Sequence, residues 1–168
     1  LKAIDGVIAT AIEGGEIPGA VLWLESKGEV VQKAYGNRMV WPGEEPMTMG
    51  TVFDVASLTK VLATTPAILL LAEEGLLDLD TPVSKHIPEK AKDEEVTAAH
   101  REGITVRHLL THQSGLPPSI YLSERDFWGH EEGVHRAATI GLLETPGTRF
   151  RYSDVNFVLL GEIVKRVS

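Results

Sequence analysis

The apolar stretch VLATTPAILLLA, residues 61–72, constrains the fold of this chain more than any other segment. It is shorter than the roughly 20 residues that a helix needs to span a bilayer, and it contains two threonines and a proline. Its apolar residues cover more than one helical face, which is typical of a helix buried between two lobes. The pattern therefore predicts a buried helix over about residues 57–74, ended by Gly75. Pro66 is expected to kink it, because proline leaves the carbonyl of Leu62 without its hydrogen bond.

The segments before this helix have different hydrophobic periods. Residues 1–15 carry apolar side chains at helical spacing and end on two glycines, which predicts an amphipathic helix. AVLWLE at 20–25 and EVVQKAYG at 29–36 flank the turn SKG and predict an antiparallel hairpin, with Trp23 and Tyr35 as strand aromatics. A loop rich in proline, glycine and polar residues follows the hairpin.

The segments after Gly75 predict two further helices. A short helix is expected from about Thr105 to Gln113, stopped by a glycine and a proline, and a last helix over roughly 154–167. Residues 119–140 are polar and weakly patterned, so no element is expected there. We therefore predict an α+β fold in which residues 1–53 form the helix and hairpin of an α/β lobe and residues 54–168 form a mainly helical lobe.

Charge and composition exclude several classes of function. The 168 residues carry a net charge of −8, and the sixteen lysines and arginines are scattered among twenty-four acids. The chain lacks the basic patch that binding to nucleic acid or to an anionic membrane needs. It has no cysteine, which excludes disulfides, thiol nucleophiles and cysteine-ligated metals. It also lacks a transmembrane segment.

The tetrad Ser57-Leu58-Thr59-Lys60 at the start of the long helix is the first candidate site. A helix N-terminus favours Asp or Glu over a cation, so Lys60 is in an unfavourable place for a purely structural residue. Residues three apart share a helix face, which lets the amine reach the serine hydroxyl and act as the base that serine needs. We expect the charged form of this amine to be disfavoured near the helix N-terminus and away from water. The alternative is a capping serine with a lysine that extends to solvent.

The segment RYSDVN, residues 151–156, is the second candidate site. Tyr152 offers a phenol, and Asp154 is placed to orient a neighbouring group or to cap the last helix. Taken alone, this segment is better explained as an N-cap with an edge aromatic. A similar Tyr-x-Asn at Tyr35 and Asn37 is assigned to the hairpin.

The remaining motifs indicate no metal and no cofactor. His108 and His112 are four residues apart on one short helix, but no acid lies between them as in a zinc protease motif, so structural roles are favoured. His130 and His135 are five residues apart, a spacing that would put them on different faces of a helix. The chain has no G-x-S-x-G nucleophile motif and no glycine-rich phosphate loop.

Four segments, in order, resemble one known family. FDVASLTK, GLLDLDTPVSKHIP, ITVRHLLTHQSGL and PGTRFRYSDVNFVLLGEIVKRVS are similar to the serine β-lactamase-like superfamily, in the branch of class C β-lactamases, D-alanyl-D-alanine carboxypeptidases and related carboxylesterases. The resemblance implies a β-lactamase/transpeptidase-like fold, with an antiparallel sheet flanked by helices beside a helical lobe. It implies that Ser57 is the acylated nucleophile, Lys60 its base partner and Tyr152 the second base and acid. The N–H of Ser57 would supply half of an oxyanion hole.

The chain departs from this family at two places. Asp154 stands where the family most often has asparagine, which changes the charge near Lys60. The third family motif, a Lys-Thr-Gly or His-x-Gly segment on a later strand, is missing. We therefore expect this chain to be an N-terminal portion of a longer enzyme, with little hydrolytic activity alone. The C-terminal strands that would cover the 20–36 hairpin are missing, so association through the unpaired sheet edge or with the missing part is expected.

The expected function is that of a metal-independent serine hydrolase acting through an acyl-enzyme on a small-molecule or peptidoglycan-like substrate. The substrate would be an ester, a β-lactam or a D-Ala-D-Ala-type amide, with esters and peptides favoured over β-lactams because of Asp154. One alternative is a penicillin-recognising sensor of the same fold that is acylated without turnover. Another is a helical interaction domain in which Ser57 is only a cap.

Overall fold

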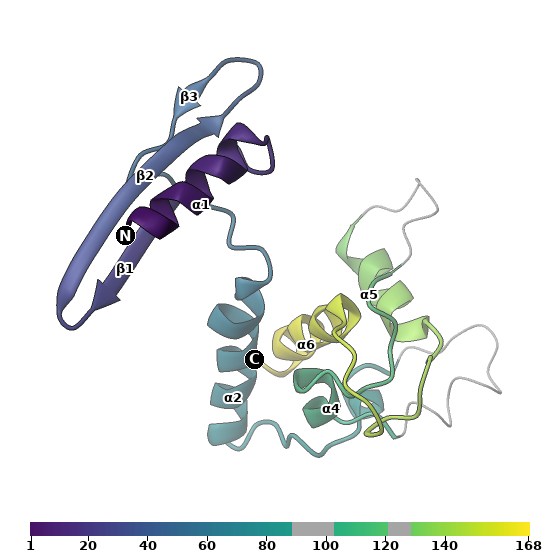
Figure 1. The fold of residues 1–168 in the computed structure, drawn as a ribbon. Coiled ribbons are helices and arrows are strands. Elements are labelled where there is room, and N and C mark those ends of the chain that lie inside the picture. Colours follow the sequence, from purple (N-terminus) through teal and green to yellow (C-terminus); the bar gives the residue numbers. More distant parts are fainter. Residues whose placement is uncertain (89–102, 121–128) are drawn as a thin grey trace. The chain divides into compact units, whose positions relative to one another are not determined.

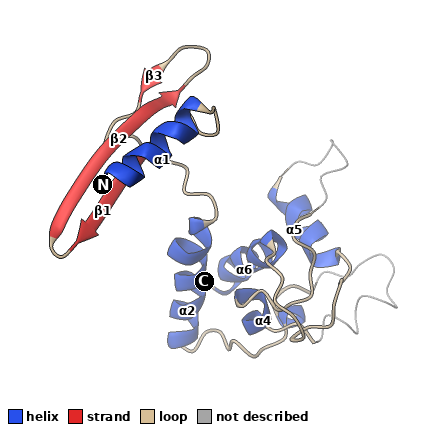
Figure 2. Cartoon of the chain, in the orientation of Figure 1, coloured by secondary structure: helices blue, strands red, loops and turns tan. Residues whose placement is uncertain are grey.

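The structure is a computed structural model that describes residues 1–88, 103–120 and 129–168. It contains two compact units, Leu1–Asp54 and Val55–Ser168, shown as ribbons in Figures 1 and 2. The first unit combines one helix with a small antiparallel sheet, and the second is built from helices. The predicted α+β class is confirmed.

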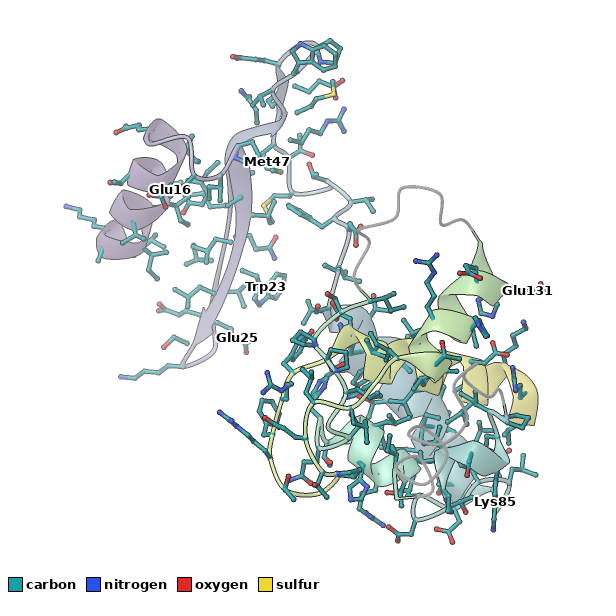
Figure 3. All side chains as sticks on the ribbon, turned by 90° about the vertical axis from the view of Figure 1, so that its right-hand side faces the viewer. Glu16, Trp23, Glu25, Met47, Lys85 and Glu131 are labelled. Atoms are coloured by element: carbon teal, nitrogen blue, oxygen red, sulfur yellow. The ribbon has the colours of Figure 1, made fainter. Side chains whose placement is uncertain are left out.

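The first unit contains the predicted helix and hairpin. Helix α1 spans Lys2–Glu13, and strands β1, Gly19–Ser26, and β2, Glu29–Met39, pair antiparallel along their whole shared length. Lys27 and Gly28 form the turn, and both have positive φ, the backbone that a two-residue hairpin requires. Figure 3 shows Trp23 on the face of the sheet turned away from α1, whereas Tyr35 donates a hydrogen bond to Asp5 of that helix at 2.7 Å.

A third strand extends the sheet beyond the predicted hairpin. Strand β3, Glu45–Pro46, pairs with the end of β2 in the order β1-β2-β3. The sequence analysis placed this segment in a loop, because two residues are too few for a strand periodicity to be read. Within the described residues, β1 is therefore an edge strand.

The helix that carries the first candidate site changes its winding before Pro66. A π-helical turn, η1, covers Lys60–Thr64 and continues into helix α2, Thr65–Glu73, with Pro66 in the first turn of α2. The N–H of Thr65 donates to the carbonyl of Lys60, five residues back. A π-helical turn thus lies where the sequence predicted a kink at Pro66, and such turns are frequent at functional sites.

The burial predicted for this helix is found on the face that meets the rest of its own unit. Ile68 and Leu71 are its buried residues, while Val61, Leu62 and Leu70 are exposed. Helix α6, Asp154–Val167, packs against α2 and η1 on the buried side. Within the described residues of the unit Val55–Ser168, no other element covers the remaining faces of this helix.

Three more helices lie in the described part of the second unit. They are η2, Val83–Lys85, a 3₁₀ turn; α4, Val106–Leu110; and α5, His130–Thr139. The predicted helices near 105–113 and 154–167 are confirmed, the first with a shorter span. Helix α5 was not expected, because its first turn is polar; residues 121–128 of the same weakly patterned segment lie outside the described residues. Apolar side chains from all these helices share one core, which includes Ile68, Val106, Leu109, Leu160 and Ile163.

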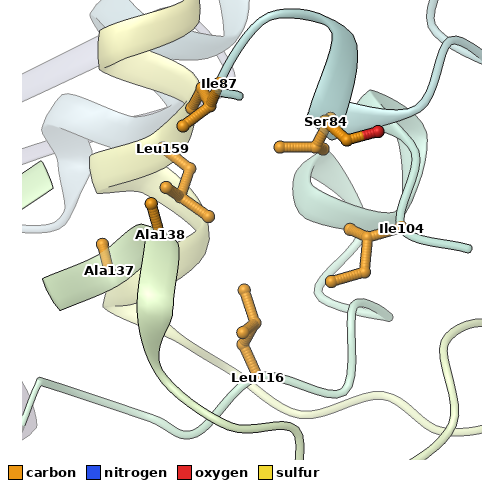
Figure 4. Close-up of a pocket in the computed structure, with 8 residues that line it drawn as sticks. Ser84, Ile87, Ile104, Leu116, Ala137, Ala138 and Leu159 are labelled. Carbon is orange, nitrogen blue, oxygen red and sulfur yellow. The ribbon is translucent and has the colours of Figure 1, made fainter. Parts of the chain in front are cut away.

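A small internal cavity of about 20 Å³ lies within this core (Figure 4). Its lining is almost entirely apolar and is formed by Val83, Ser84, Ile87, Ile104, Leu116, Ala137, Ala138 and Leu159. A space of this size holds about one water molecule, so it is a packing defect of the core rather than a substrate site. None of the helices in the described part of the chain has the length and apolar character needed to cross a membrane.

Candidate active site

Ser57 lies in a tight turn that leads into the π-helical segment. The N–H groups of Leu58, Thr59 and Lys60 each donate to the carbonyl three residues earlier, at 2.9–3.1 Å. Ala56, directly before Ser57, has a φ of +44°. A residue with a side chain seldom adopts this conformation, and such strain persists where the surrounding structure enforces it. The turn therefore fixes the serine at the start of the helix.

The side chains of Ser57, Lys60 and Tyr152 meet. The Nζ of Lys60 donates to the Oγ of Ser57 at 3.2 Å, and the hydroxyl of Tyr152 donates to the same Oγ at 2.9 Å. Lys60 reaches the serine from the same helical turn, whereas Tyr152 comes from 95 residues further along the chain. The fold thus brings together the two motifs that the sequence analysis singled out separately.

Tyr152 is placed by the segment that enters helix α6. Ser153 is the N-cap residue of α6, and its Oγ donates to the carbonyl of Pro117 at 2.6 Å instead of capping the helix. The backbone N–H of Asp154 donates to the carbonyl of Pro118 at 2.8 Å. The capping explanation considered for this segment is therefore wrong, because its polar groups bind the loop after α4 and leave the phenol free to face Ser57.

The amine of Lys60 forms an ion pair with Asp154 at a distance of 2.6 Å. The lysine side chain is only 13% exposed. Burial pushes the pKa of Lys60 down, but the hydrogen bonds to Asp154 and Tyr152 outweigh it and hold this pKa above its usual value. The expectation that the charged form is disfavoured is wrong, because Asp154 supplies a counter-charge. Lys60 is an ammonium ion in this site.

The phenol of Tyr152 is shifted in the opposite direction. Its hydrogen bond with Lys60, followed by that with Ser57, lowers the pKa of Tyr152 below the ordinary value of about 10. The Nζ of Lys60 also lies 5.1 Å from the centre of the Tyr152 ring, within cation–π range. Of the two groups that donate to Ser57, the phenol is therefore the one whose pKa moves toward easier deprotonation.

The two histidines of the short helix α4 have different surroundings. His108 completes a capping box with Thr105, which confirms its structural role. His112 lies beside the candidate site: its ring centre is 4.6 Å from that of Tyr152 and 5.2 Å from that of Phe157. Burial, and then the charge of Lys60, lower the pKa of His112. The sequence favours a structural role over a metal-ligand role for both histidines, and it does not indicate that His112 lies beside Tyr152, although His112 belongs to one of the segments that carry the family resemblance.

An open cleft lies over these side chains. Its walls combine the polar groups of the site with apolar side chains, and among the lining residues are Ser57, Lys60, His112, Tyr152, Val61 and Phe157. Across residues 1–88, 103–120 and 129–168, no three histidine or acidic side chains are grouped so that they could hold a metal ion. The chemistry of this cleft is therefore that of a serine with a cation and a phenol beside its hydroxyl.

Comparison with known proteins gives a consistent result. A family model described as Beta-lactamase matches residues 4–168. The chain is 34% identical to a Bacillus subtilis protein named N-acetylmuramyl-L-alanine amidase, over 100% of its own length and 41% of that protein. It also resembles a D-amino acid amidase from Ochrobactrum anthropi solved with L-phenylalanine, at 29% identity and a TM-score of 0.71, over 97% of this chain and 45% of that one.

A class C β-lactamase solved in complex with cefoxitin is similar as well. The TM-score is 0.74 at 27% identity, covering 99% of this chain and 44% of that one. The fold is thus β-lactamase-like, as the sequence predicted. The chain spans less than half of the length of each of these three proteins.

Proposed function

Because the chain belongs to the β-lactamase family, we propose that it holds the acylation site of a serine hydrolase, with Ser57 as the nucleophile. The observation that supports this most strongly is the pair of hydrogen bonds on one oxygen. The Oγ of Ser57 lies 2.9 Å from the phenol of Tyr152 and 3.2 Å from the amine of Lys60. A serine is a weak nucleophile until a neighbouring group takes its proton, and the phenol of Tyr152 is within reach for that task.

In the proposed acylation step, Tyr152 is the base. Its phenolate accepts the proton of the Ser57 hydroxyl while Oγ forms a bond to the carbonyl carbon of the substrate, and the carbonyl electron pair moves onto oxygen. When the tetrahedral adduct collapses, the Tyr152 hydroxyl returns the proton to the leaving alcohol or amine, and Ser57 keeps the acyl group as an ester. Lys60 stays charged throughout and stabilises the phenolate. Water then repeats the sequence and releases the acid.

Asp154 favours a neutral substrate in this scheme. Its carboxylate neutralises the Lys60 ammonium at 2.6 Å, whereas an asparagine would leave that positive charge unpaired. An unpaired cation beside the nucleophile would attract the carboxylate that penicillins and D-Ala-D-Ala peptides carry. We therefore place neutral esters first among the three substrate classes, ahead of D-Ala-D-Ala-type amides and β-lactams.

The test is covalent labelling of the full-length protein that carries this chain, followed by intact mass over time. A fluorophosphonate probe should add one adduct to the wild type and to Ser119→Ala, whose serine is exposed and outside the cleft, and none to Ser57→Ala. Absence of the adduct from the wild type, or its persistence in Ser57→Ala, would refute the proposal.

A second time course separates an enzyme from a sensor. With p-nitrophenyl acetate, an acetyl adduct that forms and decays on Ser57 supports a hydrolase. A penicilloyl adduct that persists, with no ester turnover, would contradict the hydrolase and support the penicillin-recognising sensor instead.

A further inference from the structure

His112 holds the residues on both sides of Tyr152, one through its backbone carbonyl and the other through its ring. The N–H of Arg151 donates to the carbonyl of His112 at 2.8 Å, and the N–H of Ser153 donates to Nδ1 of the His112 ring at 3.1 Å. Between these two bonds, the ring itself lies against the Tyr152 ring, with centres 4.6 Å apart and planes 31° apart. His112 therefore binds the backbone on each side of Tyr152 and contacts Tyr152 itself through the two rings.

We propose that His112 is a positioning residue that holds the Tyr152 phenol against Ser57. This inference rests on the proposed function. It assigns His112 no contact with the reacting atoms: it acts through Tyr152, by fixing the backbone on each side of that residue and by supporting one face of its ring.

The hydrogen bonds of His112 also fix its tautomer. Nδ1 faces two groups that can only donate, the N–H of Ser153 and the side-chain amide of Asn156 at 3.2 Å. It must therefore be the acceptor, which places the ring proton of the neutral imidazole on Nε2. The Asn156 amide is oriented in turn, because its Oδ1 accepts from the hydroxyl of Ser114 at 2.6 Å. That hydroxyl accepts from the N–H of Leu116.

This polar network lies in the core, where polar groups are costly unless each one is paired. Asn156 is fully buried and Ser114 is 1% exposed. An apolar core would be simpler to stabilise, so a buried network that is fully bonded indicates that its geometry is specified. This series of hydrogen bonds ends at Nδ1 of His112, the atom that accepts the hydrogen bond from the N–H of Ser153.

The backbone of His112 is consistent with a constrained role. Its φ is +56°, in the left-handed region that residues with side chains seldom adopt. The conformation follows the end of α4 at Leu110 and turns both the carbonyl and the ring of His112 toward the strand-like segment at residues 151–153. Strain of this kind clusters at functional sites, where the surroundings enforce it.

The test compares variants of His112 in the full-length protein. His112→Gly keeps the positive φ without strain and removes the ring, and His112→Asn also tolerates that φ while offering an oxygen to the N–H of Ser153. The control, His108→Asn, alters the histidine that caps the same helix without touching Tyr152. The measurement is the rate at which the fluorophosphonate phosphonylates Ser57, with loss of fluoride, as a function of probe concentration; it stands in for the acylation rate.

We expect His112→Gly to lower the limiting acylation rate constant by about 100-fold, because displacing a reacting group by about 1 Å has an effect of that size. The half-saturating probe concentration should change much less than the rate constant, because His112 acts on proton transfer through Tyr152, although its ring also lines the cleft. His112→Asn should recover at least 5-fold of the loss, and His108→Asn should acylate like the wild type.

Two results would overturn the inference while leaving the proposed function intact. One is a His112→Gly variant that acylates at the wild-type rate. The other is an equal loss of acylation rate in His108→Asn, which would mean that the loss comes from a less stable α4 and not from Tyr152. If His112→Gly fails to fold, a His112→Asn variant that folds but acylates no faster than Tyr152→Phe also contradicts it. A wild type that is never acylated refutes the proposed function itself.

Discussion

The amine of Lys60 lies closer to the carboxylate of Asp154, at 2.6 Å, than to the hydroxyl of Ser57, at 3.2 Å. The ion pair therefore dominates the surroundings of the lysine and holds it as an ammonium. An ammonium donates hydrogen bonds but cannot accept the serine proton, so the proton must go elsewhere. In our account it goes to Tyr152, and the predictions below follow from that assignment.

Replacing Asp154 by asparagine should shift the pH dependence of acylation. The negative charge of Asp154 raises the pKa of Tyr152, so its removal should lower that pKa further. Because acylation requires the phenolate, its rate rises with pH through this pKa, and Asp154→Asn should move the midpoint of the rise to lower pH. The measurement is the rate at which the fluorophosphonate labels Ser57 across the pH range, which stands in for the acylation rate. The control is Asp80→Asn, which breaks the ion pair with Arg107 outside the cleft. A midpoint of the pH rise that is unchanged or higher in Asp154→Asn would contradict the account.

Replacing Lys60 by methionine should raise the pKa of Tyr152. The hydrogen bond with Lys60 is the largest cause of the lowered pKa, and methionine keeps the length of the side chain without its charge. Ultraviolet titration of tyrosinate absorbance measures this pKa. The titration curve of the double variant that also has Tyr152→Phe is subtracted from that of Lys60→Met, which leaves the signal of Tyr152. Acylation at neutral pH should fall by about 10²–10⁴-fold. The control is Lys165→Met at an exposed position of α6, which should change neither the pKa of Tyr152 nor the acylation rate. A Tyr152 pKa that stays low in Lys60→Met would show that Lys60 does not lower it.

The buried carboxylate of Glu162 should make the stability of the helical unit depend on pH. Burial raises the pKa of Glu162, but hydrogen bonds from Arg166 and His130, at 2.6 and 2.7 Å, bring it below the usual value. A carboxyl whose folded-state pKa is lowered stabilises the fold above its unfolded-state pKa, and the contribution is lost as pH falls through the folded-state value. Glu162→Gln should therefore reduce the free energy of unfolding by about 2 kcal/mol at pH 7.

Urea unfolding at neutral and at acidic pH tests this expectation. The difference between the wild type and Glu162→Gln should shrink in acid, where the wild-type carboxyl is also neutral. The matched control is Glu131→Gln on the exposed side of α5 (Figure 3), which should change stability by less than about 0.5 kcal/mol. A difference for Glu162→Gln that grows as pH falls would have the wrong sign for this ion pair.

The parts of the fold that could be predicted from sequence are those with a strong local pattern. The hairpin of β1 and β2 and the helix α1 each combine a regular period with a clear stop or turn signal. Helix α2 is marked by its long apolar run and by Gly75, and α6 is predicted without a stop signal at its end. Strand β3 has two residues and no period of its own. Helix α5 begins with His130, Glu131 and Glu132, so its apolar face becomes visible only where Val134, Ala137 and Ala138 meet the core.

The candidate site was predicted in part for a similar reason. Ser57 and Lys60 are neighbours on one turn, and helical spacing alone places them together. The meeting of Tyr152 with Ser57 depends on a chain reversal across 95 residues, which only the family resemblance could indicate. The charge of Lys60 was predicted wrongly, because the ion pair with Asp154 depends on that same long-range contact. The position of His112 depends on a positive φ that no local pattern revealed.

The most direct test of the account is a comparison of two tyrosine-to-phenylalanine variants by fluorophosphonate labelling of Ser57, read by intact mass. Tyr152→Phe removes only the hydroxyl that lies 2.9 Å from Ser57, and Tyr35→Phe removes a hydroxyl that binds Asp5 in the other unit. We predict that Tyr152→Phe slows labelling by about 10²–10⁴-fold while Tyr35→Phe labels at the wild-type rate. Equal labelling of Tyr152→Phe and the wild type would contradict the assignment of the phenol as the base.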